Sequence, residues 1–170
     1  MKRFLILVIL ALFGTAAFAS SVNTYLYVSA TLVAAVSVST SSLNFGSFTP
    51  TSDTETFANG GITVNATSGL PYHITLDKGY YYGDAGYSGW RSLSNGTGYV
   101  VYGLWQDSAF TTQWGDNDYL DTYPNGSSQA GTGTGGGQAF TVYGILYPYT
   151  ATTGSTAGTY VDYVTVTVNY

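Results

Sequence analysis

The side chains that could do chemistry in this sequence are few and scattered. His73 is the only histidine, Glu55 is the only glutamate, and the chain has no cysteine. His73 falls within an alternating apolar pattern, which is typical of a structural side chain on a strand. A nucleophile with its base, a zinc-binding histidine pair, or paired catalytic carboxylates would each need residues or spacings that the sequence does not show. We therefore expect a protein that is not an enzyme and has no cofactor.

The densest acidic cluster contains Asp116, Asp118 and Asp121. Carboxylates two residues apart can bind Ca²⁺, but an EF-hand loop also needs a glycine at a fixed position and a distant glutamate. The sequence supplies neither in this region. A polar loop is therefore the favoured interpretation, with weak calcium binding as the alternative, and no metal site is predicted.

Aromatic residues crowd the segment 79–90, which reads GYYYGDAGYSGW. Tyrosine and tryptophan rings can stack on the apolar face of a sugar, so this segment could form a binding platform together with Trp105 and Trp114. Tyrosine is also common in pleated sheets and at protein interfaces. The second interpretation is favoured because it needs no ligand.

The chain begins with MKRFLILVILALFGTAAFAS. Two cations, an apolar run over residues 4–13 and the small residues Ala17 and Ala19 together predict a secretory signal peptide over residues 1–19. The apolar run is shorter than the ~20 residues that a membrane-spanning helix needs. We therefore expect the chain to be exported and cut after Ala19.

Charge and composition then limit the partners of the exported chain. Lys78 and Arg91 remain against nine carboxylates, which argues against binding to nucleic acid or to an anionic membrane. Charged residues make up only 8% of the sequence, whereas tyrosine occurs 17 times. A weakly charged surface of this kind is expected to contact other protein. Without disulfides, stability must come from the core, from strand pairing or from a partner.

Period-two alternation of apolar residues predicts strands, and no convincing helix is found. Short strands separated by Gly, Ser, Asn and Asp turns predict an all-β, antiparallel sandwich or barrel. Glycine falls in the middle of two of these strands, at Gly103 and Gly144, which suggests a bulge or a close backbone contact. The segments 78–90 and 124–138 are predicted to be loops. The predicted strands cover residues 21–32, 32–40, 42–50, 60–67, 70–77, 97–107, 138–149 and 160–170.

The last predicted strand has β-branched residues on both faces, and Val164, Val166, Val168 and Tyr170 form its valine-rich face. An exposed strand of this length with an apolar face is prone to aggregate through its unpaired backbone groups. We therefore expect a neighbour to cover each of its edges.

Several blocks of the sequence together resemble the spore coat protein U domain family, which includes subunits of archaic chaperone–usher pili. The most informative blocks are LNFGSFTP (43–50), the block 102–115 with its YGLWQD start, and the ending GTYVDYVTVTVNY (158–170). The resemblance implies an incomplete immunoglobulin-like antiparallel β-sandwich completed by a donor strand. In such a fold the strand 160–170 would form one wall of an acceptor groove. A periplasmic chaperone would bind this groove first, and the next subunit would fill it.

A matching donor lies directly after the predicted cleavage site, in residues 20–31, before a domain over residues 32–170. The alternative is that this segment folds back as the first strand of its own domain, although the short connection to residues 32–40 would have to reverse direction tightly. The side chains expected to enter the groove of another subunit are Val22, Thr24, Leu26, Val28 and Ala30.

Members of the resembled family typically carry a disulfide, and here Leu32 and Ala66 are expected at the two cysteine positions. A bridge of that span would contribute roughly 3–4 kcal/mol, so its absence matters. A large and a small apolar residue can fill the space of two buried sulfur atoms. We therefore interpret Leu32 and Ala66 as a pair that replaces the disulfide.

The resemblance implies a structural pilus subunit that passes through the periplasm and an outer-membrane usher to the cell surface. Its partners would be identical or homologous pilin subunits, a chaperone and the usher, and the fibre would serve adhesion or biofilm formation on a glycan or abiotic surface. Two alternatives stay open. One is a secreted, monomeric carbohydrate-binding module, and the other is a surface-coat protein that does not form pili.

Overall fold

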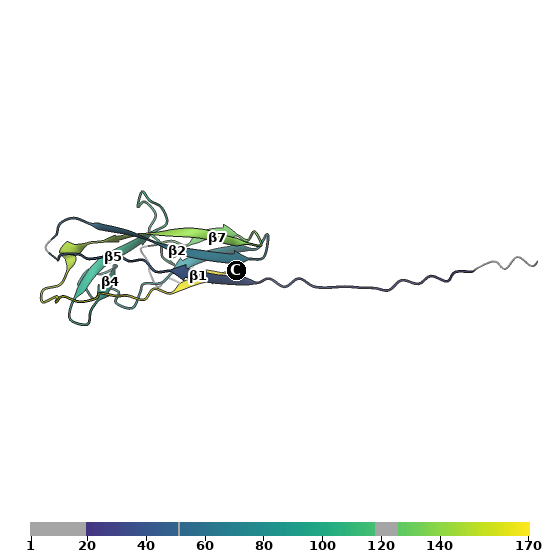
Figure 1. Ribbon diagram of the computed structural model, residues 1–170, viewed down its shortest axis with the longest axis horizontal. Helices are drawn as coiled ribbons and strands as arrows, with labels where there is room; N and C mark the ends of the chain where they lie inside the picture. The colour runs from purple at the N-terminus through teal and green to yellow at the C-terminus, as the bar shows by residue number, and fades with distance from the viewer. Residues whose placement is uncertain (1–19, 51, 118–125) are drawn as a thin grey trace, which may run out of the picture. The chain divides into compact units, whose positions relative to one another are not determined.

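The computed structural model describes residues 20–50, 52–117 and 126–170 (Figure 1). The predicted signal peptide, residues 1–19, lies outside this part of the chain. The described chain divides after Leu32 into the segment 20–32 and the domain 33–170. No helix in the described ranges is long and apolar enough to cross a membrane.

The segment 20–32 contains no helix or strand, and its side chains are exposed. The alternation of apolar and polar residues here predicts a strand, but a strand needs a neighbour for its backbone N–H and C=O groups. The described structure pairs no strand with this segment. The sequence pattern therefore indicates that the segment can form a strand, but the segment does not form one without a neighbouring strand.

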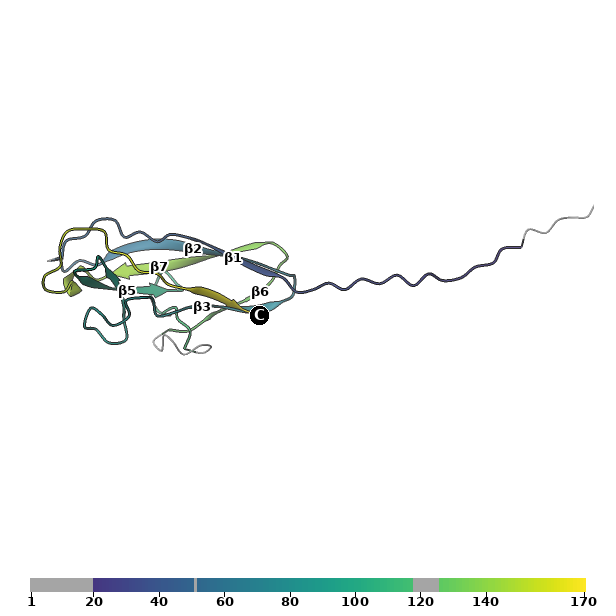
Figure 2. The same cartoon turned by 90° about the horizontal axis from the view of Figure 1, so that it is seen from below.

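The domain 33–170 consists of two antiparallel sheets, as predicted. The larger sheet has the strand order β1-β2-β7-β5-β4, and the smaller one has the order β6-β3-β8. In Figure 2, β1, β2 and β7 lie in one layer and β3 and β6 in the other. The elements are β1 (Val36–Ser41), β2 (Thr56–Ala66), β3 (Pro71–Leu76), β4 (Arg91–Ser94), β5 (Tyr99–Trp105), β6 (Gln129–Thr132), β7 (Gly137–Leu146), the 3₁₀ helix η1 (Pro148–Thr150) and β8 (Val166–Asn169).

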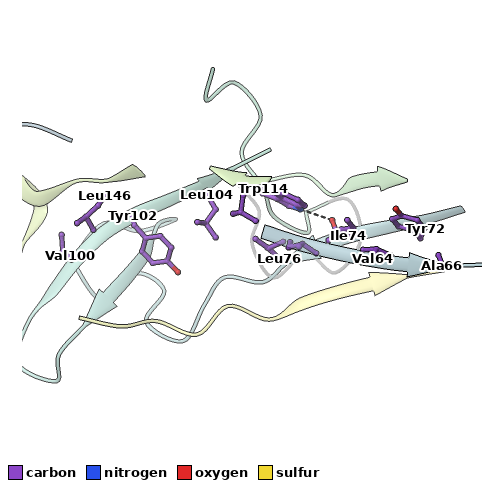
Figure 3. Close-up of a cluster of buried hydrophobic side chains, with 12 residues drawn as sticks. Val64, Ala66, Tyr72, Ile74, Leu76, Val100, Tyr102, Leu104, Trp114 and Leu146 are labelled. Carbon is purple, nitrogen blue, oxygen red and sulfur yellow. Dashed lines mark hydrogen bonds between the residues drawn. The ribbon is translucent and has the colours of Figure 1, made fainter. Parts of the chain in front are cut away.

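The core lies between the sheets, where the inward residues of the strands meet (Figure 3). Val64, Ile74 and Leu146 are completely buried, and burial of each such side chain contributes about 1.5–3 kcal/mol. Trp114 enters the same core, and its Nε1–H donates a hydrogen bond of 3.1 Å to the carbonyl of Ile74. This bond satisfies the one polar group of the indole, which permits its complete burial.

Two short strands, β4 and β6, were not predicted from the sequence. The segment 124–138 was expected to be a loop throughout, but its residues 129–132 pair with β3 because Gly131 lets the ring of Tyr72 pack against the backbone. β4 begins at Arg91, which is completely buried and donates to the carbonyls of Leu76 (3.0 Å) and Trp114 (2.9 Å). Tertiary contacts, rather than local propensity, decide both strands.

Gly103 and Gly144 lie at close contacts and not at bulges. A Cβ atom at Gly103 would collide with the ring of Trp105 two residues on. A Cβ atom at Gly144 would lie 2.9 Å from both Leu43 and Phe45. The predicted strand 42–50 is absent from the ladders, and its first half instead packs across β7 at Gly144.

Candidate acceptor groove

An apolar groove with a volume of ≈ 900 Å³ opens in the domain 33–170. Residues 40–48 line one wall, and residues 155–164 together with Val166 line the other. Part of its floor is formed by core side chains from strands of both sheets, namely Ile62, Leu76, Leu93, Tyr102, Leu104, Val142 and Leu146. The groove thus reaches down to the hydrophobic core, and six of these seven floor side chains are themselves buried. We call it the acceptor groove.

The C-terminal wall of the groove presents an unpaired strand edge. β8 is an edge strand that pairs only with β3, and Asp77 N–H donates to the carbonyl of Thr165 (3.1 Å). In an antiparallel ladder, alternate residues point their backbone groups to opposite sides. The N–H and C=O groups of Val164, Val166 and Val168 therefore face away from β3. Within the described chain, no strand pairs with that edge.

The opposite wall is built from three aromatic and aliphatic side chains that follow β1. Leu43, Phe45 and Phe48 are partly buried against the core. Phe45 makes an edge-to-face contact with Tyr102 in the floor, with ring centroids 6.2 Å apart. Phe48 makes a similar contact with Tyr160, at 5.4 Å. Because Tyr160 belongs to the C-terminal wall, this last contact joins the two walls.

Asp162 anchors the C-terminal wall to the rest of the domain. Its carboxylate accepts hydrogen bonds from the hydroxyl of Tyr102 (2.6 Å) and from the backbone N–H groups of Tyr80 (2.9 Å), Tyr81 (3.3 Å) and Tyr163 (2.8 Å). Burial raises the pKa of Asp162 above its ordinary value, although these hydrogen bonds act in the opposite direction. The sequence analysis did not single out Asp162. Its only signal was its place within the terminal block 158–170.

Further backbone bonds hold this wall on both sides of Asp162. Ser94 and Val161 exchange two hydrogen bonds of 2.9 Å each, which attach the wall to the end of β4. The carboxylate of Asp77 accepts from the N–H of Thr165 (2.9 Å), next to the start of β8. The wall therefore crosses from the larger sheet to the smaller one. One side of the wall is hydrogen-bonded to the rest of the domain, whereas the other edge of β8 pairs with no strand in the described chain.

The structure places the predicted acceptor residues in three different settings. Val164 and Val166 line the groove and pack against the core. Val168 packs against the core but is not part of the groove lining. Tyr170 is 68% exposed and does not line the groove. The groove also extends over residues 155–159, which precede the strand 160–170 that was predicted as its wall.

The predicted donor side chains are accessible, but their role stays a prediction. Val22, Leu26 and Val28 are each more than 80% exposed, and Thr24 and Ala30 are also exposed. An exposed row of large apolar side chains within one segment is unusual for a soluble protein and marks an interaction site.

The pair Leu32 and Ala66 also stays a prediction, and Val36 emerges as a second candidate partner. Ala66 is buried in β2, and the residue opposite it in the register is Val36 of β1. Val36 is partly buried against the core. Leu32 belongs to the separately described segment and is exposed. Within the domain 33–170, Val36 is therefore the residue that packs beside Ala66.

The remaining chemistry-bearing residues are held in structural contacts. His73 Nδ1 lies 3.1 Å from the hydroxyl of Ser128. Asp116 is completely buried, while Asp118 and Asp121 lie outside the described residues. Among the residues that the structure describes, no group of three or more His, Cys, Asp or Glu side chains could hold a metal ion. Trp105 and Trp114 are buried, so neither can belong to a surface platform for sugars.

Comparisons with known proteins agree with this architecture. The sequence profile of the family described as Spore Coat Protein U domain matches residues 22–167. No match was found among curated proteins. A similar solved structure is a chain in the CsuC–CsuE chaperone–tip adhesion subunit pre-assembly complex from archaic chaperone–usher Csu pili of Acinetobacter baumannii. The identity is 16% and the TM-score is 0.57, over 82% of the present chain and 40% of that chain. The match thus spans less than half of the neighbour's length, and it shows a shared fold.

Proposed function

Since the chain belongs to the Spore Coat Protein U domain family, we propose that it is a structural subunit of an extracellular pilus assembled by the chaperone–usher pathway. The observation that carries the proposal is the acceptor groove, which lies beside the open edge of β8 and has core side chains in its floor. The groove needs an extended segment as its occupant, and the chain carries such a segment at residues 20–31.

The groove and the segment complement each other chemically. An added strand must bring backbone groups for the open edge and apolar side chains, at every second position, for the floor. The side chains at every second position of the segment are Val22, Thr24, Leu26, Val28 and Ala30. The groove lining holds one charged side chain, Asp162, and its carboxylate already accepts four hydrogen bonds. An uncharged donor therefore fits.

The expected strength of the joint follows from the burial of these side chains. Each large apolar side chain contributes about 1.5–3 kcal/mol when it is fully buried, and each backbone hydrogen bond contributes roughly 0.5–1.5 kcal/mol. Val22, Leu26, Val28 and a ladder along β8 together contribute a term of the same order as the cost of association. A polymer made in this way would be long-lived without any disulfide.

Insertion into another copy is favoured over insertion into the same domain. Only residues 32–35 separate the segment from the start of β1 at Val36, so folding back would require a tight reversal within a short connection. Insertion into another copy requires no such turn. It also turns a joint between two chains into a fibre, because every subunit has one groove and one donor.

The same groove defines the other partners. An exposed apolar groove would aggregate during export, so a periplasmic chaperone would cover it until an outer-membrane usher exchanges the chaperone for the next donor. The chaperone–subunit complex among the similar structures supports this role. The chain would be secreted through the periplasm and would end in a cell-surface pilus. There it would serve adhesion to glycan or abiotic surfaces and biofilm formation, without catalysis.

Engineered disulfides test the proposal directly, because the natural chain has no cysteine. Val28→Cys in the donor is combined with one cysteine in a wall of the groove, at Leu43, Phe45, Phe48, Tyr160 or Val164 in turn. At matching positions we expect a ladder of covalent oligomers on non-reducing gels. Each rung corresponds to one joint between neighbouring subunits.

The matched control places the donor cysteine at Tyr27, on the opposite face of the segment, where it should not cross-link to the groove. Covalently closed monomers would mean that the segment completes its own domain. Failure to cross-link at every wall position would mean that the segment does not enter the groove at all. Either result would contradict the proposal.

A further inference from the structure

A second concavity of the domain is lined by four aromatic residues among six lining residues. Its volume is ≈ 310 Å³, and it shares no residue with the acceptor groove. It brings together parts of the chain that are far apart in sequence: the aromatic segment 79–90, strand β5 and the helix η1. The lining residues are Tyr87, Trp90, Val101, Tyr147, Tyr149 and Thr150. We call this site the aromatic pocket.

Hydrogen bonds hold both sides of the aromatic pocket in place. Gly83 N–H donates to the carbonyl of Trp90 (2.9 Å), which closes the loop that carries Tyr87. On the other side, the Thr150 hydroxyl accepts from Val101 N–H (2.8 Å) and donates to the carbonyl of Tyr147 (2.6 Å). The pocket is therefore built before any ligand arrives, which reduces the entropic cost of binding.

The rings form a corner, and two of them remain partly exposed. Trp90 and Tyr147 meet edge to face, with centroids 5.8 Å apart and planes at 84°. Tyr147 and Tyr149 are 5.9 Å apart at 67°. Tyr87 and Tyr149 remain 46% and 49% exposed. Because adjacent rings are steeply inclined, a ligand in the corner can stack on one ring while its edge meets another.

The chemistry of the lining restricts the ligand to a small, neutral ring. None of the lining residues carries a charge, which disfavours ionic ligands. The volume is at the lower end for small-molecule pockets, so it suits one or two rings and not an extended peptide. A flat surface cannot enter a concave site. Tyrosine places a hydroxyl at the border of an apolar ring, and a pyranose has the same combination of an apolar face and a polar edge.

We propose that the aromatic pocket binds a neutral pyranose, with the sugar stacked on Tyr149 or Trp90 and its hydroxyls bonded to the tyrosine hydroxyls. This activity would give every subunit of a fibre its own weak sugar site. The proposal does not depend on donor-strand exchange, because the groove and the pocket have no residue in common. A single site of this size is expected to bind with a dissociation constant of about 1–10 mM.

Tryptophan fluorescence of the mature chain tests this proposal. The chain has three tryptophans, and Trp105 and Trp114 are buried, so a ligand in the pocket should change the emission of Trp90 selectively. The probes are the methyl glycosides of glucose, galactose and mannose. Sorbitol serves as a control because it has the hydroxyls of a hexose without the ring. We expect saturable changes with at least one glycoside and none with sorbitol.

Substitutions then locate the site. Tyr149→Ala and Tyr87→Ala should each weaken binding by about tenfold, which is the loss expected for one stacking contact. Tyr80→Ala is the matched control, because Tyr80 is 76% exposed and lies outside the pocket. Urea unfolding of each variant checks that the fold is intact. Three results would each overturn the proposal: no saturation with any of the glycosides, an equal response to sorbitol, or unchanged affinity in both pocket variants.

Discussion

The two end segments of the described chain have the same alternating pattern but different structures. Residues 21–32 and 160–170 both place apolar side chains at every second position. In the C-terminal segment, β8 pairs with β3 and three valines pack against the core. The N-terminal segment has no strand neighbour, and its valines and leucines are exposed. An alternating pattern therefore specifies a strand only when the unpaired edge of another strand is available to pair with it.

This difference also explains how a fibre can be built from one kind of chain. The C-terminal segment uses one of its edges within the domain and leaves the other open beside the acceptor groove. We propose that the N-terminal segment supplies the side chains that enter this groove in a neighbouring subunit. The N-terminal segment of each chain would therefore fill the acceptor groove of its neighbour, and completion of the fold would coincide with assembly.

The largest expected effect comes from charges on the donor face. The double variant Leu26→Asp, Val28→Asp should abolish polymerisation, because two buried carboxylates without partners cost far more than the apolar contacts contribute. The matched control is Tyr25→Asp, Tyr27→Asp, which places the same charges on the opposite face. Sizes of the assembled material on gels without boiling distinguish the two. Normal assembly of the first variant would show that the donor assignment is wrong.

A new disulfide would show where the N-terminal segment stops and the domain begins. Ala35 and Thr67 are bonded across β1 and β2, so the next pair, Val36 and Ala66, is the closely spaced type, which suits disulfide geometry. Val36→Cys with Ala66→Cys should therefore form a bridge that stabilises the domain by about 3–4 kcal/mol. Non-reducing gels and urea unfolding measure both quantities. If Leu32→Cys with Ala66→Cys forms the bridge instead, the predicted pair is correct and the boundary lies earlier.

Asp162→Asn should loosen the C-terminal wall without unfolding the domain. The amide oxygen can accept fewer and weaker hydrogen bonds than the carboxylate, although relief from burying a charge offsets part of the loss. We expect a decrease of about 1 kcal/mol in the free energy of unfolding at neutral pH. Asp84→Asn, at an exposed position of the neighbouring loop, is the control. An equal effect of both variants would remove Asp162 as the anchor of the wall.

The smallest effect is a difference in pH dependence between two carboxylates. Burial raises the pKa of Asp162 above 3.8, so the part of its contribution to stability that depends on protonation is fully present below its unfolded pKa and is lost as the pH rises through its folded pKa. Hydrogen bonds from the backbone of Thr112 and its neighbours lower the pKa of Asp107. The contribution of Asp107 is therefore present at neutral pH and is lost as the pH falls through its folded pKa.

Urea unfolding at a series of pH values separates these two contributions. Asp162→Asn should change the slope of stability against pH only above about pH 4, and Asp107→Asn only below it. An unchanged slope in Asp162→Asn would mean that the carboxylate is as well solvated in the folded domain as in the unfolded chain.

Much of the fold could be predicted from the sequence because the long strands carry their own pattern. The predicted strands over 70–77, 97–107 and 138–149 correspond to β3, β5 and β7, whose apolar residues alternate or form buried runs. The family membership also followed from blocks of residues and is confirmed by the match over residues 22–167. In each case the residues that form the pattern are close together in the sequence, so the pattern can be recognised without the structure.

What the sequence could not provide depends on contacts between distant residues. β4 contains Arg91, which reads as a surface charge until its carbonyl partners at Leu76 and Trp114 are known. Residues 42–48 alternate like a strand but pack on Gly144 as a wall of the groove. The carboxylate of Asp162 gains its role only because Tyr102, which precedes it by 60 positions, donates to it. None of these contacts leaves a local pattern.

The most direct test of the central claim is the thermal stability of a version that starts at Leu32, measured with and without a synthetic peptide of residues 22–31. We expect a low unfolding midpoint for the short version alone and a large rise when the peptide is added. A scrambled peptide should have no effect, and the mature chain should form heat-stable ladders. A short version as stable as the mature chain, unaffected by the peptide, would contradict donor-strand exchange, as would a mature chain that remains a stable monomer.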